Sequence, residues 1–349
     1  MSRIHDLGGQ FGGKAFLDSN ESPFGPPAGA IRRLLTHLDR LHRYPRGLRE
    51  EVTRAVADHY QVDPASVLLT CGVDEATDLA LSTRPRAWCV MPGFDGYADR
   101  ARFIGRPVQT IALDGEWQPT IAPDRFGVND VVFVAQPNNP TGNMFHRRWV
   151  DALVRSPALT FMDETYLEFT DEPSNVSRLD VRPDLVVFKS FSKMFGLAGL
   201  RVGAMLGHPD LIARFAGGQS FYSTDSVALS AILGALEDTD FQDRHVRYIR
   251  EARNRYVNVL ARSAHVEETR NTQANFVLAR CRNEAAAEFV VGALADRRIH
   301  VRDCVSVGLP GWLRVSVGTP DDLVALATAL SEFDFTAASP PVGEVAVHA

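Results

Sequence analysis

The chain of 349 residues is long enough for one large domain or two unequal ones, and its 45% hydrophobic and 23% charged residues are ordinary for a globular protein. Its formal net charge of −6 excludes the broad basic surface that nucleic acid or an anionic membrane would require. It contains no apolar run of the roughly 18 residues that a membrane span needs, and its first residues lack the apolar core of a signal peptide. Four scattered cysteines without metal-ligand spacing indicate free thiols, no metal site and a cytoplasmic location.

Short apolar runs alternate with amphipathic stretches through the first two thirds of the chain. The predicted strands are Val67–Cys71, Ala87–Met91, Val108–Leu113, Val131–Ala135, Leu159–Asp163, Leu185–Lys189 and Val202–Leu206. The helical patterns among them include Arg49–Tyr60, Asp74–Ser82 and Arg147–Arg155. This alternation predicts an α/β fold in which helices cover both faces of a mostly parallel sheet.

The last third of the chain has a different pattern. It is helical from about Asp225 to Ala264. Three short strands follow at Asn275–Ala279, His300–Arg302 and Trp312–Val317, with helices between and after them at Glu284–Arg297 and Pro320–Phe333. We therefore predict a large domain over residues 40–240 and a smaller α+β domain from residues 1–39, an N-terminal arm included, and 241–335. The stretch 336–349 has no periodicity, so we expect a flexible tail.

Polar groups cluster where predicted strands end, which is where open α/β sheets bind ligands. Val73 and Asp74 open a helix whose free N–H groups suit a phosphate, although an aspartate there is often only a helix cap. The turn at residues 137–142, PNNPTG, offers two amides on a stiff backbone, and Asp163 with Tyr166 places a carboxylate and a phenol after the next strand.

Lysine is rare in this chain. Of the 37 basic residues only Lys14, Lys189 and Lys193 are lysines, and a GC-rich genome accounts for the preference for arginine but not for the places where lysine remains. A lysine amine can lose its proton and form an imine, whereas a guanidinium stays protonated. Lys193 follows Ser190 and Ser192 and is flanked by apolar residues, so two hydroxyls that could hold a phosphate lie beside its amine in the sequence.

In this order the four segments resemble the fold-type-I enzymes that use pyridoxal 5′-phosphate (PLP), and most closely the class II aminotransferases that act on histidinol phosphate. The resemblance runs from about Leu17 to Arg314, and its most specific string is SFSKMFGLAGLRVG at residues 190–203. It implies a large domain with a mostly parallel seven-stranded sheet, a smaller α+β domain, and PLP as the cofactor.

The resemblance also implies roles for the residues that match the family's motifs. Lys193 would form the Schiff base and then move the proton, and Asp163 would keep the pyridine nitrogen of PLP protonated. Asn139 and Tyr166 would donate to its phenolic oxygen, with Lys193, Asp163 and Tyr166 as the catalytic set. The remaining cofactor residues would be Val73 and Asp74 by their amides, Ser190, Ser192 and Arg201 at the phosphate, Phe94 stacked on the ring, and Tyr44 reaching the phosphate of the neighbouring subunit in a homodimer.

Substrate contacts rest on fewer motifs. Arg314 matches an arginine that holds a substrate carboxylate or phosphate, Arg302 matches a second arginine near that phosphate, and Asn275 lies on the strand leading there. Phe24 stands where the family commonly has tyrosine, so the position loses a hydroxyl. The chain also has a shortened stretch between Gly72 and Phe94, which lies beside the expected phosphate site.

The resulting hypothesis is an aminotransferase that moves an amino group between an amino acid, or an amino alcohol phosphate such as histidinol phosphate, and a 2-oxo acid by a ping-pong mechanism. The alternatives are a decarboxylase of the same fold, like those acting on threonine phosphate, or an aminotransferase of specialised metabolism. A non-catalytic regulator on this fold is a third interpretation, against which the intact Lys193 argues.

Overall fold

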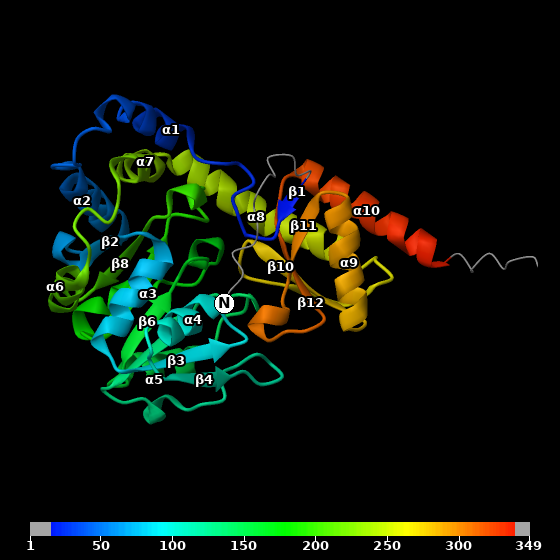
Figure 1. Ribbon diagram of the computed structural model, residues 1–349, viewed down its shortest axis with the longest axis horizontal. Helices are drawn as coiled ribbons and strands as arrows, with labels where there is room; N and C mark the ends of the chain where they lie inside the picture. The colour runs from blue at the N-terminus through cyan, green and yellow to red at the C-terminus, as the bar shows by residue number, and fades with distance from the viewer. Residues whose placement is uncertain (1–14, 339–349) are drawn as a thin grey trace, which may run out of the picture.

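The computed structural model describes residues 15–338, and its larger part is built on one seven-stranded sheet (Figure 1). The strands are β2 (Val67–Thr70), β3 (Arg86–Met91), β4 (Val108–Ala112), β5 (Asp130–Ala135), β6 (Leu159–Asp163), β7 (Leu185–Ser190) and β8 (Gly203–Gly207). Their order is β2-β8-β7-β6-β5-β3-β4, and only β8 runs antiparallel to its neighbours. All seven predicted strands are confirmed within one or two residues, and the fold class is confirmed with them.

Helices cover both faces of this sheet because its central strands are apolar on both sides. Every residue of β5 is buried, and alternate residues belong to two separate core clusters: Val132 and Val134 to one, Val131 and Phe133 to the other. The helices of this part are α2 (Leu48–Tyr60), α3 (Gly72–Thr83), α4 (Asp95–Phe103), α5 (Arg147–Arg155), α6 (Pro209–Gly218) and α7 (Ser226–Glu237).

A second sheet of five strands, in the order β1-β11-β12-β10-β9, forms the smaller part of the molecule. Its elements are β1 (Ala15–Leu17), β9 (Val266–Asn271), β10 (Phe276–Cys281), α9 (Glu284–Asp296), β11 (Ile299–Asp303), β12 (Trp312–Ser316) and α10 (Pro320–Ala338). The long helix α8 (Thr239–Leu260) runs from the first sheet's side to the second (Figure 1). The sequence did not reveal β1 or β9, since β1 has three residues and β9 is mostly polar.

The helix α1 (Ala28–Leu35) packs along α7, and glycine allows this close approach: a Cβ on Gly29 would lie 2.4 Å from the Gly234 carbonyl oxygen. Residues 15–17 thus join the small sheet, while α1 lies against α7, a helix of the larger part. The predicted domain boundaries stay a prediction. The helix α10 continues to Ala338, so residues 336–338 of the expected tail are helical. The rest of that tail, and Lys14, lie outside the described residues.

None of the helices in residues 15–338 is long and apolar enough to cross a membrane.

Candidate active site

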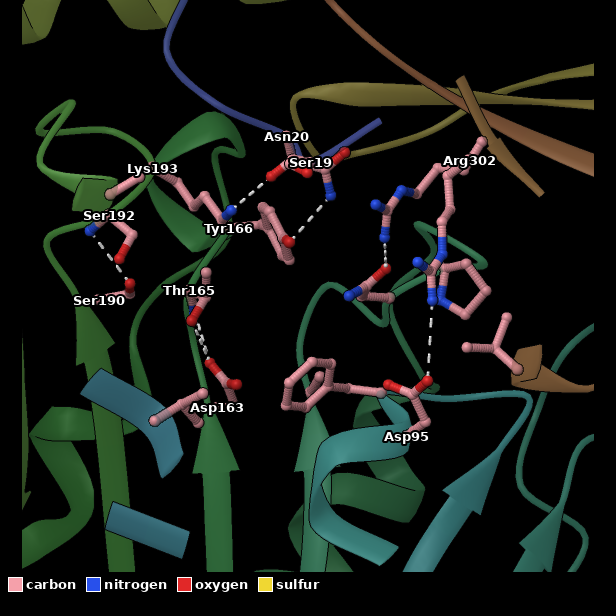
Figure 2. A pocket seen from close by; sticks show the side chains of 18 of the residues that line it. Ser19, Asn20, Asp95, Asp163, Thr165, Tyr166, Ser190, Ser192, Lys193 and Arg302 are labelled. Atoms are coloured by element: carbon pink, nitrogen blue, oxygen red, sulfur yellow. Dashed lines mark hydrogen bonds and ion pairs between the residues drawn. The ribbon is translucent and has the colours of Figure 1, made fainter. Parts of the chain in front are cut away.

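A cavity of about 300 Å³ opens at the carboxyl ends of β5, β6 and β7, and the small sheet forms its opposite wall (Figure 2). All the residues predicted for the site line this cavity except Tyr44, Asp74, Phe24 and Asn275. Parallel strands bring these side chains together because their carboxyl ends share one edge of the sheet.

Lys193 reaches into the cavity from the loop after β7, and its Nζ donates to the carbonyl oxygen of Ser19 at 2.7 Å (Figure 2). Burial lowers the pKa of this amine to about 8, and the nearby guanidinium groups of Arg314 and Arg201 act in the same direction. A substantial fraction of the amine is therefore unprotonated near neutral pH, which is the form that attacks a carbonyl carbon.

Asp163, the last residue of β6, is almost fully buried at the cavity floor. Burial raises the pKa of its carboxyl group, and three hydrogen bonds oppose that rise by favouring the carboxylate. The backbone N–H of Thr165 donates at 2.9 Å, and the hydroxyls of Thr165 and Tyr97 donate to the two carboxylate oxygens. The sequence interpretation missed Tyr97 and Thr165, although both lie three residues or fewer from a predicted site residue.

Among the residues that line the cavity are four that suit a phosphate: Val73, Ser190, Ser192 and Arg201. The helix α3 begins at Gly72 without a side-chain cap, so its first N–H groups are available to an anion. Gly72 has φ +69°, and a Cβ there would lie 2.9 Å from Arg201 Nη2, so only glycine lets the guanidinium lie this close to the helix start. The side chain of Asp74 contacts Arg201 at 3.4 Å instead of lining the cavity.

Tyr166 and Asn139 line the cavity between Asp163 and the small sheet. The Tyr166 hydroxyl accepts a hydrogen bond from Asn20 Nδ2 at 3.0 Å (Figure 2). Ser316 Oγ in turn accepts from the Asn20 backbone N–H and donates to Asn20 Oδ1. Asn275 is fully buried and donates to the Asn20 carbonyl oxygen at 2.9 Å, so it supports this network from behind. Asn20 has φ 54°, an uncommon conformation that its surrounding hydrogen bonds stabilise.

The two predicted substrate arginines are direct neighbours across the antiparallel strands β11 and β12. Arg314 donates to Asn139 Oδ1 at 2.6 Å and to the Asp18 carbonyl oxygen, while its Nε is buried without a hydrogen-bond partner among residues 15–338. Burial lowers the pKa of the Arg314 guanidinium. Like charges directly opposite each other destabilise a sheet, so this pair is stabilised by negative charge placed beside it.

Two predicted site residues lie away from the cavity. Phe24 packs edge-on against Tyr248 and His245 of α8, at ring distances of 4.9 and 5.6 Å. Tyr44 is 66% exposed and stacks on Tyr222 at 4.5 Å. Their roles toward the substrate and toward a neighbouring subunit stay predictions.

The residues present fit PLP. The glycine that clears space beside Arg201 and the serine hydroxyls suit its phosphate, the buried and hydrogen-bonded Asp163 suits its ring nitrogen, and Lys193 supplies an amine of lowered pKa. Phe94 lines the cavity where a ring could stack, and it packs edge-on against Tyr97 at 5.0 Å. Fold and site together define a PLP-dependent enzyme of fold type I.

The comparisons with known proteins agree with this class. The family model for aminotransferase class I and II matches residues 14–330, and the chain belongs to this family. It is therefore an aminotransferase, and PLP is its cofactor.

Individual relatives show the same relationship. The chain is 31% identical to the histidinol-phosphate aminotransferases of Halorubrum lacusprofundi, over 90% of this chain and 88% of the relative, and of Symbiobacterium thermophilum, over 94% and 92%. Among solved structures it is similar in fold to the histidinol-phosphate aminotransferase of Sinorhizobium meliloti in complex with PLP, with a TM-score of 0.84, 22% identity and coverage of 93% and 92%. The L-threonine-O-3-phosphate decarboxylase of Porphyromonas gingivalis has a TM-score of 0.79, 21% identity and coverage of 91% and 99%.

Proposed function

We propose that this aminotransferase takes an amino group from an α-amino acid or a histidinol-phosphate-like amine and passes it to a 2-oxo acid in a ping-pong reaction of amino-acid biosynthesis. The observation that carries the proposal is the meeting of Lys193, Asp163 and the arginine pair in one cavity. The names of the 31%-identical relatives support a histidinol-phosphate-like donor.

Each residue of the site has its own proposed role in the reaction. When bound, PLP supplies the carbonyl group that takes up the amino group and a ring that withdraws electrons from the substrate. Asp163 would hold the ring nitrogen protonated, while Asn139 and Tyr166 would donate to the phenolic oxygen. Lys193 Nζ would form the covalent link and then move the proton at the substrate's reacting carbon, and Arg314 would orient the substrate by its anionic group.

The proposed assembly is a homodimer in the cytoplasm, with Tyr44 reaching the neighbouring subunit's phosphate site. Exposed large apolar side chains beside Tyr44 support a subunit contact there: Leu41 and Tyr222 line one hollow with Tyr44, and Phe221 precedes Tyr222. The four cysteines are free thiols, which supports a reducing compartment.

Lys193→Ala tests the proposal directly. The variant loses the one lysine among the described residues that line the cavity, so we expect no covalently attached PLP after borohydride reduction and loss of donor-dependent turnover. Mass spectrometry measures the attachment, and stopped-flow spectra with histidinol phosphate, aromatic and basic amino acids measure the half-reaction. Lys193→Arg keeps the positive charge and should be equally inactive, and turnover by either variant would overturn the role of Lys193.

The decarboxylase alternative shares the cofactor residues and an arginine pair that could hold a phosphate. Release of labelled carbon dioxide from a carboxyl-labelled donor, without formation of an amino acid from the 2-oxo acid, would establish it in place of transamination.

A further inference from the structure

Arg302 and Arg314 face each other across two strands, but their surroundings differ. Arg314 contacts neutral acceptors, namely the amide oxygen of Asn139 and the Asp18 carbonyl oxygen. Arg302 contacts a carboxylate: its Nη2 lies 3.8 Å from Asp95 Oδ2 and 3.2 Å from Ser306 Oγ. The negative charge beside Arg302 is therefore already supplied by the protein.

Asp95 is the first residue of α4, on the large-domain side of the cavity, whereas Arg302 comes from β11 of the small sheet. Figure 2 shows the two side chains approaching each other across the pocket. Both are 24% exposed, so the pair is only partly shielded from water and a substrate group entering here meets both charges.

The wall beside this pair is apolar. Phe94, Cys304 and Val307 line the cavity near Arg302, and burial raises the pKa of the Cys304 thiol to about 11, so the thiol is uncharged at neutral pH. Phe24 stands where the family commonly has a tyrosine, so this position brings no hydroxyl, and its ring packs against α8. A dianionic phosphate bound at Arg302 would thus be attracted by the Arg302 guanidinium and repelled by the Asp95 carboxylate.

We propose that Asp95 is a specificity-determining residue that, by occupying Arg302, disfavours substrates with a phosphate at this end and favours α-amino acids with an uncharged side chain. The substrate's single carboxylate then pairs with Arg314, and the substrate's side chain lies against Val307 beside the neutralised Arg302–Asp95 ion pair. The inference rests on the proposed function and narrows its choice of donors.

The test compares Asp95→Asn and Asp95→Ser with the unchanged holoenzyme. We measure kcat/KM for histidinol phosphate and for phenylalanine, and the binding of inorganic phosphate to the PLP-loaded protein by calorimetry. Both variants remove the Asp95 carboxylate, a negative charge that repels phosphate. We therefore expect kcat/KM for histidinol phosphate, relative to kcat/KM for phenylalanine, to rise about tenfold, and inorganic phosphate to bind about tenfold more tightly.

Asp99→Asn is the matched control, because it makes the same charge change one turn further along α4, where Asp99 pairs with Arg102 outside the cavity. It should leave both quantities unchanged. If Asp95→Asn alters neither the ratio nor phosphate binding, the inference about Asp95 is overturned while the proposed function stands. If no donor reacts with any form, the proposed donors fail, and phosphate binding alone still decides the role of Asp95.

Discussion

At the scale of single residues, Lys193 and Lys189 show how position changes the chemistry of one residue type. Lys193 sits among the cations Arg314 and Arg201, and burial lowers the pKa of its amine. Lys189 lies four residues earlier, and its Nζ is 2.8 Å from Glu164 and 3.2 Å from Glu168. The charges of these two carboxylates outweigh the effect of burial and raise the pKa of the Lys189 amine. Only Lys193 is therefore suited to nucleophilic attack.

The lowered pKa of Lys193 predicts the pH dependence of cofactor attachment. Only the neutral amine adds to an aldehyde, so the rate at which the apoenzyme links PLP should rise with pH around a midpoint of about 8, well below an ordinary lysine's value. Replacing Arg314 by Met removes a nearby cation and should move the midpoint upward. Stopped-flow absorbance measures the rate, and a midpoint near that of free lysine would contradict the assignment.

At the scale of elements, neighbouring strand ends carry the site, and a buried ion cluster connects them. Glu164 follows Asp163 directly after β6, Lys189 precedes Ser190 in β7, and both are almost fully buried. Glu164 also accepts hydrogen bonds from Ser174 and from the backbone and side-chain nitrogens of Asn175. The cluster therefore fixes the two strand ends relative to each other, directly behind the catalytic groups.

Lys189→Met should destabilise the protein strongly, because it leaves Glu164 and Glu168 without their cation in a buried place. We expect the free energy of unfolding to fall by about 3–5 kcal/mol, measured by denaturant titration. Arg33→Met breaks the exposed pair with Glu237 and should cost less than about 1 kcal/mol. Equal effects of the two variants would show that the Lys189 cluster has no special structural role.

At the scale of the whole molecule, apolar residues left exposed around Tyr44 support the proposed homodimer. Phe221 is 98% exposed and Tyr222 is 50% exposed, and Tyr44 stacks on the latter. Single exposed apolar residues need no explanation, but a group of them around a predicted cofactor residue favours a subunit contact.

Phe221→Glu should therefore weaken the proposed dimer, seen as a shift toward the monomer in sedimentation experiments. Tyr44→Phe should keep the proposed dimer and lower the affinity for PLP about tenfold, because it would remove the hydrogen bond that we propose Tyr44 makes to the phosphate of the neighbouring subunit's site. Val324→Glu, an equally drastic change on exposed α10, serves as the control and should alter neither property. A dimer unaffected by Phe221→Glu would contradict the assignment of this surface.

The sequence by itself determined the elements whose pattern is local: the apolar strands of the large sheet, the motifs at their carboxyl ends, and the lysine after two serines, Lys193, that could form an imine. It could not reveal β9, whose residues are mostly polar, or Tyr97, whose hydroxyl meets Asp163 only when α4 packs on the sheet.

Only the tertiary structure decided which predicted residues share one cavity and what faces each of them. It placed Arg302 opposite Arg314 and beside Asp95, and it set Phe24 against α8. The physical reason is that strand register and helix packing join residues far apart in the chain, and charge compensation depends on those distances, which no local pattern contains.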